Sequence, residues 1–130
     1  MHDISALFAG EGELRTELTL LGRYVLSVLN QESQFLQVAA RTPADQSDRL
    51  NAAYAALVDG LYSELADWIG GCAPGLEQAE ARRIAVVGVN ALLGKQATRV
   101  VFLAPQADTP DEEYIADWTA MLAGRIEAAR

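Results

Sequence analysis

Hydrophobic residues recur at helical spacing along most of the chain, and no segment alternates apolar and polar residues over the length of a strand. This pattern predicts an all-α protein, an antiparallel bundle of about five to six helices forming a single domain over residues 1–130. Helices are expected over residues 3–9, 13–31, 33–41, 44–69 and 76–102, and from residue 109 onward.

Two of the long helices carry one clear apolar stripe each, which predicts one buried face per helix. The first stripe comprises Leu14, Leu18, Leu21, Val25, Val28 and Leu29. The second falls within about 80° of arc and comprises Leu50, Tyr54, Leu57, Leu61, Leu65 and Trp68. Gly70-Gly71 is expected to end the second of these helices.

The segment IAVVGVNALL, residues 84–93, is apolar on every side of its predicted helix except at Asn90. A helix of this kind must be covered all round, and in a chain of this size a second copy is the simplest cover. The Asn90 amide needs hydrogen-bond partners, either across a subunit interface or in a ligand cavity. A homodimer interface is therefore predicted through Val86, Val89, Leu93, Ile115, Trp118 and Leu122.

The most specific local signal is the sequence Thr109-Pro110-Asp111-Glu112. Threonine is a good N-cap, proline suits the first helical position, and a glutamate at the third position completes a capping box. The last helix is therefore expected to begin with Thr109 as its cap.

Composition and charge exclude several classes of protein. Half of the 130 residues are hydrophobic, which argues against disorder, and the net charge of −8 argues against nucleic-acid binding by this chain alone. The longest apolar run has ten residues, about half of what a membrane span needs. A single cysteine and the lack of a signal-like N-terminus predict a cytoplasmic protein.

Candidate chemistry is sparse. The chain has one histidine, His2, and no phosphate-binding or nucleophile motif, so neither a metal, a cofactor nor a catalytic residue is predicted, and the chain is not expected to be an enzyme. Tyr24, Phe35 and Tyr54 have the large apolar bodies that either fill a core or line a pocket. Glu64 lies about 40° from the centre of an apolar stripe, where it either pairs with an arginine or faces a polar cavity.

The order of helices resembles the C-terminal regulatory domain of TetR-type (tetracycline-repressor-like) transcriptional repressors. The stretch AVVGVNALLGKQATRVVFLAPQADTPDEEYIADWTAMLAG is similar to the last two helices of that domain, and FLQVAARTPADQSDRLNAAYAALVDGLYSELADWI to the preceding pair. The resemblance covers about residues 14–130. Family members begin with a basic helix-turn-helix domain of about 50 residues that this sequence lacks, so the chain is either a fragment or a standalone product.

The resemblance implies an effector-binding and dimerisation domain that senses a small, mostly apolar ligand, and a dimer built from the last two helices. The ligand-binding residues it implies are Tyr24, Val28, Phe35, Tyr54, Leu57, Leu61, Glu64 and Asn90. The alternative is a helical assembly or adaptor domain that binds no small molecule. A ligand cavity would distinguish the first function from the second.

Overall fold

The computed structural model describes residues 14–32, 48–100 and 109–130, and all the regular structure in these ranges is helical. The all-α prediction is thereby confirmed for the described residues. The short helices expected over residues 3–9 and 33–41 lie outside them. The helices are α2 (Leu14–Gln31), α4 (Asp48–Cys72), α5 (Gln78–Val100) and α6 (Asp111–Ala128).

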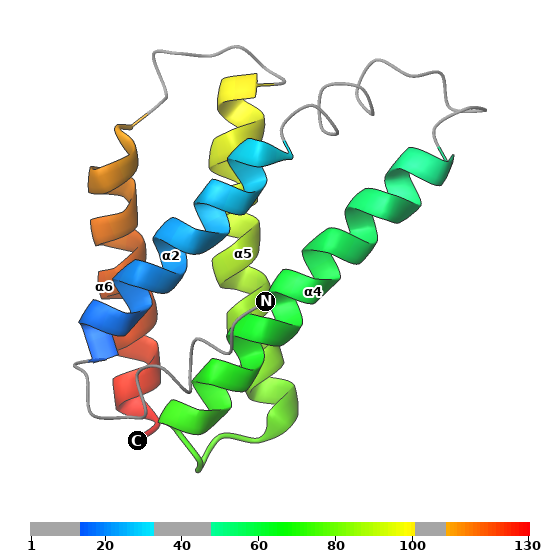
Figure 1. Ribbon diagram of the computed structural model, residues 1–130. Helices are drawn as coiled ribbons and strands as arrows, with labels where there is room; N and C mark the ends of the chain where they lie inside the picture. The colour runs from blue at the N-terminus through cyan, green and yellow to red at the C-terminus, as the bar shows by residue number, and fades with distance from the viewer. Residues whose placement is uncertain (1–13, 33–47, 101–108) are drawn as a thin grey trace.

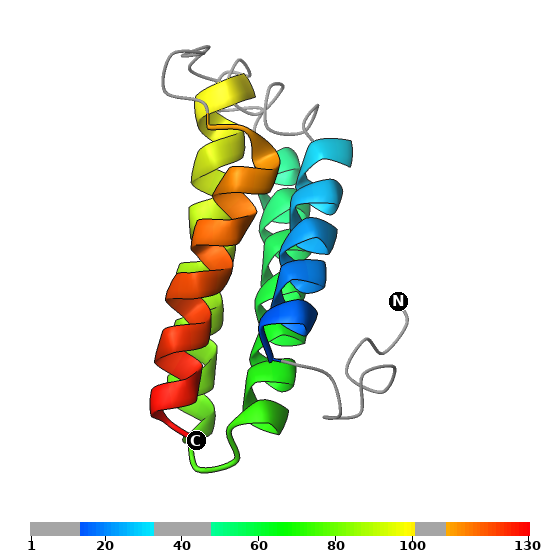
Figure 2. The same ribbon diagram turned by 90° about the vertical axis from the view of Figure 1, so that its left-hand side faces the viewer.

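The four helices form a bundle in which α4 packs chiefly along α5, and α2 packs on α6 and α5 (Figure 1). Seen from the side, α5 and α6 run next to each other over most of their length (Figure 2). Helix α4 is tilted, so its N-terminal half diverges from α2 (Figure 1). None of the helices in the described ranges is long and apolar enough to cross a membrane.

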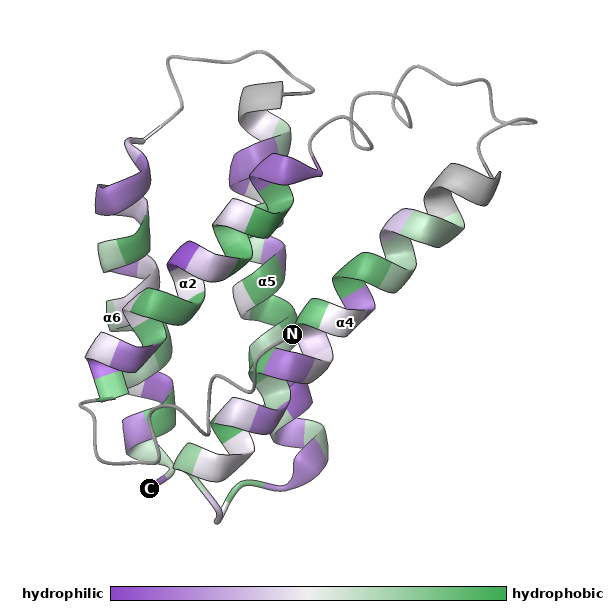
Figure 3. Cartoon of the chain, in the orientation of Figure 1, coloured by the Kyte–Doolittle hydropathy of each residue, from purple (hydrophilic) through white to green (hydrophobic). Residues whose placement is uncertain are grey.

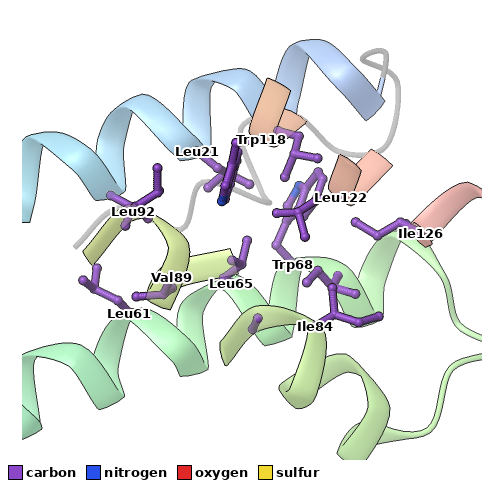
Figure 4. Close-up of a cluster of buried hydrophobic side chains, with 14 of the residues drawn as sticks. Leu21, Leu61, Leu65, Trp68, Ile84, Val89, Leu92, Trp118, Leu122 and Ile126 are labelled. Atoms are coloured by element: carbon purple, nitrogen blue, oxygen red, sulfur yellow. The ribbon is translucent and has the colours of Figure 1, made fainter. Parts of the chain in front are cut away.

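The core lies where the apolar faces of the four helices meet, and Figure 4 shows side chains from all four pointing into it. The predicted stripe of α2 is confirmed at its buried positions, since Leu18 and Leu29 are fully enclosed. Hydrophobic and hydrophilic residues interleave along the helices (Figure 3), as expected for elements with one buried face. The largest fully enclosed side chains are Leu18, Leu29, Leu65, Ile69, Val89, Leu92, Ile115 and Ile126.

The indole of Trp118 on α6 contacts both α2 and α5. A Cβ added at Gly22 of α2 would lie 2.7 Å from Trp118 Cζ3, and one added at Gly88 of α5 would lie 3.5 Å from Trp118 Cζ2. The indole Nε1 donates a hydrogen bond of 2.8 Å to the Gly88 carbonyl oxygen. Gly22 therefore makes room for the ring, whereas the tightest contact of an added Cβ at Gly88 is with Leu122 Cδ1 at 3.0 Å. The α5 backbone satisfies the buried N–H group of the indole.

Ion pairs tie α2 to α6 along the outside of the bundle. Arg23 contacts Glu112 at 2.7 Å, and Arg15 contacts Glu127 at 3.3 Å. These side chains are about half exposed, so each pair contributes roughly 0–1 kcal/mol and serves to set the register of the two helices.

The glycine pair does not end α4, which continues through Gly70 and Gly71 to Cys72. The helical hydrogen bonds extend to Ala73, whose N–H donates to the Ile69 carbonyl at 2.9 Å. The following residue is Pro74, which disfavours the helical conformation of the residue before it. The proline and not the glycine pair therefore fixes this helix end.

The start of α6 also differs from the prediction. Pro110 occupies the N-cap position and the helix has no side-chain cap, so Thr109 is not part of a capping box. The almost fully buried Lys95 of α5 donates from Nζ to the Thr109 carbonyl oxygen at 2.5 Å and lies 3.3 Å from an Asp111 carboxylate oxygen. Acidic residues in the first turn further stabilise the helix through its dipole. A tertiary contact thus replaces the local cap.

Replacing Lys95 by methionine is expected to lower the free energy of unfolding by about 1–3 kcal/mol, because a charge-assisted hydrogen bond and an ion pair are lost together. Thr109→Ala should stay within about 0.5 kcal/mol of the parent, since the exposed hydroxyl caps nothing. Urea denaturation of both variants provides the comparison. A larger loss for Thr109→Ala than for Lys95→Met would contradict this account of the α6 start.

The fit of Trp118 against Gly22 gives a second prediction. Gly22→Ala should destabilise the protein by about 1–3 kcal/mol, because the new methyl group has no space beside the enclosed indole. Gly60→Ala in α4 is the matched control, since nothing lies within 4 Å of its added Cβ, and it should stabilise the protein by about 0.5–1 kcal/mol. Thermal unfolding measures both, and a neutral Gly22→Ala would show that the contact is not tight.

Candidate functional site

The first candidate site is a groove between α5 and α6 on the outside of the bundle, called here the α5–α6 groove. It has a volume of about 300 Å³. Trp118 and Leu122 form its floor, while Val87 and Met121 stand at its edges, 66% and 76% exposed. Its lining residues are Val87, Gly88, Ala91, Thr109, Tyr114, Asp117, Trp118, Met121 and Leu122.

A second, more polar hollow of about 320 Å³ continues the groove along α5. It shares Ala91, Thr109 and Tyr114 with the apolar part and adds the polar side chains of Asn90 and Thr98. The two hollows together extend along the outer side of α5 over about three helical turns. The surface is therefore apolar at one end and hydrogen-bonding at the other.

Two aromatic residues of α6 fix the shape of the groove by bonding to the backbone of α5. Tyr114 and Trp118 lie one helical turn apart, and their polar ends donate to the Ala91 and Gly88 carbonyl oxygens at 2.9 and 2.8 Å. The Lys95 ammonium lies 5.3 Å from the Tyr114 ring centroid, within cation–π range. These contacts hold α5 and α6 at a constant separation, so the groove is already formed in the single chain.

The second candidate site is the facing sides of α2 and α4, called here the α2–α4 seam. Three pairs of electrostatic neighbours indicate that α2 and α4 run antiparallel along the seam. The charge of Glu17 acts on Cys72, that of Glu64 on Tyr24, and that of Glu32 on Tyr54. Tyr24 lies on α2 and Glu32 directly follows that helix, eight residues later, so the last two pairs are separated by about 12 Å along the helix axis. Val28 lies between Tyr24 and Glu32 in the sequence, and its side chain packs against the buried core to which Leu61 belongs.

Partial burial perturbs the ionisable groups of the seam. Burial raises the pKa of Glu64 above its ordinary value of 4.5. Burial, and then the negative charge of Glu64, raise the pKa of the Tyr24 hydroxyl. Burial and the nearby Glu32 likewise raise the pKa of Tyr54, whose hydroxyl oxygen is buried without a hydrogen-bond partner. The seam therefore disfavours negative charge and contains polar groups that lack partners.

Glu17 is the most deeply buried acid of the described residues, at 2% exposure. Its Oε1 atom has no hydrogen-bond partner. Its charge contributes to a raised pKa of the Cys72 thiol, for which burial is the larger cause and Arg130 an opposing one. Cys72 is therefore held as the neutral thiol at the lower end of the seam.

Of the eight residues predicted to bind ligand, the structure relates one pair directly, because the charge of Glu64 on α4 acts on the Tyr24 hydroxyl of α2. Val28 of α2 and Tyr54 and Leu57 of α4 are partly exposed, and Leu61 of α4 is buried in the core. Phe35 lies outside the described residues. Asn90 does not join this pair: it is exposed on α5 and accepts a hydrogen bond from the hydroxyl of Tyr62 on α4. Asn90 also lines the polar end of the α5–α6 groove.

The residues predicted for the dimer interface are placed mainly in the core of the single chain. Val89 and Ile115 are enclosed by neighbouring helices, so no partner can reach them. Val86 and Leu93 are half buried. Trp118 and Leu122 are buried but form the floor of the α5–α6 groove. The helix 84–93 is thus covered mostly by its own chain, and its exposed apolar position is Val87.

Sequence reasoning missed Val87, Met121, Glu17 and Lys95. The face that Val87 occupies could not be chosen from a segment that is apolar all round. Glu17, in contrast, lies seven residues before Tyr24, which places the two residues within about 20° of each other around the helix axis. The sequence therefore already puts Glu17 on the same face of α2 as Tyr24. The signal was present for Glu17 and absent for Val87.

Among the described side chains, no group of three or more His, Cys, Asp or Glu residues is placed to hold a metal ion. Comparisons with protein-family models, with curated proteins and with solved structures found no match to this chain. The function is therefore argued from the groove and the seam.

Because burial raises the pKa of Glu64 in the folded chain, ionisation of this carboxyl lowers the free energy of unfolding. Below the ordinary pKa the carboxyl is protonated in both the folded and the unfolded chain, and stability falls as the pH rises from there through the higher folded pKa. Glu64→Gln should therefore raise the melting temperature at pH 7 and have no effect near pH 3. Asp67→Asn, an exposed position of the same helix, is the control and should change stability by less than about 0.5 kcal/mol. A destabilised Glu64→Gln at pH 7 would contradict this sign.

Proposed function

We propose that this chain is an effector-binding and dimerisation domain of a TetR-like transcriptional regulator, in which the α2–α4 seam takes a small, mostly apolar ligand and the α5–α6 groove joins two copies. The observation that carries the proposal is the preformed apolar groove across two adjacent helices, with Val87 and Met121 exposed at its edges. Any contact with DNA would belong to a separate DNA-binding domain, because the net charge of this chain is −8.

The groove has the properties that a two-fold interface requires. In such an interface the same patch meets itself, so it needs both protruding and hollow parts. Val87 and Met121 supply protruding apolar side chains, while Gly88 and Ala91 leave the adjacent hollow. Pairing α5 and α6 with the same helices of a second copy would form a four-helix arrangement that covers both exposed side chains.

The seam and the groove share one mechanical connection. Tyr24 lies two residues from Gly22, and Gly22 packs against Trp118, whose ring forms part of the groove floor. A ligand bound between α2 and α4 acts on the position of α2, and the contact between Gly22 and Trp118 transmits that displacement to α6. Ligand binding at the seam would in this way alter the geometry of the dimer, as a regulator that couples a ligand to the spacing of two subunits requires.

Sedimentation at micromolar concentration tests the dimer. The parent should sediment at twice the 14.0 kDa chain mass, and Val87→Glu should weaken association at least roughly tenfold because it buries an unpaired charge. Ala56 is exposed on α4, a helix that does not line the groove. Ala56→Glu is therefore the matched control and should leave the dimer intact. Val89→Glu is unsuitable, since Val89 is in the core and its loss would unfold the chain.

A folded monomer for the parent at these concentrations would overturn the dimerisation part of the proposal. If Ala56→Glu dissociated as readily as Val87→Glu, association would not use the groove. A groove that binds a different helical protein and not a second copy would favour the adaptor function, provided that no small molecule binds at the seam.

A further inference from the structure

The edge of the α5–α6 groove carries a methionine that is open to solvent. Met121 of α6 is 76% exposed, more than any other large hydrophobic side chain in the described ranges. Its neighbours Trp118 and Leu122 on the same helix are buried and form the floor of the groove. Met121 therefore combines access from solvent with a position on the surface proposed to join two copies.

Methionine differs from the other apolar side chains of the groove because its sulfur reacts with peroxides. The thioether sulfur of Met121 attacks one oxygen of hydrogen peroxide, and an S–O bond forms as the O–O bond breaks. The departing oxygen leaves as water, so the sulfur loses the two electrons that the peroxide gains. The product sulfoxide is polar and needs water or a hydrogen-bond donor beside its oxygen.

The groove provides no free donor for a sulfoxide beside Met121. Tyr114 and Trp118, the two donors among the α6 side chains of the lining, already donate to backbone carbonyl oxygens of α5. Asp117, one turn before Met121, supplies a carboxylate that accepts hydrogen bonds. The Thr109 hydroxyl belongs to the part of the groove shared with the polar hollow, which Met121 does not line. A sulfoxide enclosed between two such surfaces would stay unpaired.

The other sulfur side chain of the described residues is the Cys72 thiol, which does not line the groove. Burial raises its pKa, and a thiol reacts with peroxide chiefly as the thiolate. A thioether needs no deprotonation before it reacts. Met121 is therefore the sulfur whose oxidation bears directly on the groove.

We propose that Met121 is an oxidation site at the dimer interface, where conversion to the sulfoxide by hydrogen peroxide weakens the pairing of two copies through the α5–α6 groove. This inference rests on the proposed dimerisation and specifies how that interface is regulated. Because pairing covers Met121, oxidation takes place on the dissociated chain, and the oxidised chain pairs less tightly. Dimerisation therefore protects Met121, so its oxidation slows as the protein concentration rises.

Sedimentation of the full chain before and after peroxide treatment tests the proposal, with oxidation followed as the gain of one oxygen mass in the peptide that contains Met121. Complete oxidation should raise the dissociation constant of the dimer at least roughly tenfold, because two unpaired sulfoxides would be buried. Helix content by circular dichroism should stay unchanged, since Met121 lies outside the core. Protein concentrations above the dissociation constant should slow the oxidation of Met121.

Two variants separate Met121 from the other sulfur groups, each compared with its own untreated sample. Met121→Leu keeps an apolar side chain but has no sulfur at the groove, so peroxide should leave its dissociation constant unchanged. It retains Met1 and Cys72 and therefore controls for oxidation elsewhere in the chain. Cys72→Ala should respond to peroxide as the parent does.

A parent dimer that persists after full oxidation of Met121 would overturn the inference and leave the proposed dimer in place. Equal dissociation of treated Met121→Leu, or a loss of helix content in the oxidised parent, would also overturn it, because the cause would then lie outside the groove. An oxidation rate independent of protein concentration would show that pairing leaves Met121 uncovered, with the same consequence. A parent that is monomeric before treatment would overturn the dimer and the inference together.

Discussion

The bundle depends on the placement of one indole ring against a glycine of a neighbouring helix. Trp118 of α6 reaches Gly22 of α2 and Gly88 of α5, and its N–H group bonds to the α5 backbone. A larger residue at Gly22 would push α2 away from α6, and the loss of the hydrogen bond would leave a buried donor unpaired. Glycine lowers the intrinsic stability of a helix, so close packing of the ring against Gly22 offsets a local cost on α2.

The two candidate sites have different physical origins. The α5–α6 groove is rigid, because Tyr114 and Trp118 bond side chain to backbone across it. The seam lies where the tilted α4 diverges from α2, and two of its buried polar atoms, Glu17 Oε1 and the Tyr54 hydroxyl oxygen, have no hydrogen-bond partner. A preformed apolar surface suits association with another folded surface, whereas an incompletely satisfied seam suits a ligand that supplies the missing contacts.

The sequence was sufficient for the helices and for the buried face of α2, because the period of Leu18, Leu21 and Leu29 is a local property. It also placed Tyr24, Tyr54 and Glu64 on facing helices. It could not predict which face of residues 84–93 is exposed, because a segment that is apolar on every side does not distinguish one face from another. Asn90 also depends on another helix, since it accepts its hydrogen bond from Tyr62 of α4. The prediction for the start of α6 was wrong for a similar reason. The group that donates to the Thr109 carbonyl oxygen is Lys95, which lies 14 positions away in the sequence.

The positions of the two tryptophans give the chain a built-in optical readout. Trp68 and Trp118 are both buried, but Trp118 belongs to the junction of α2, α5 and α6, whereas Trp68 lies on α4, one turn from Glu64. Because both rings belong to the same buried cluster, their emission reports on the packing of the core that the four helices share, without any attached dye.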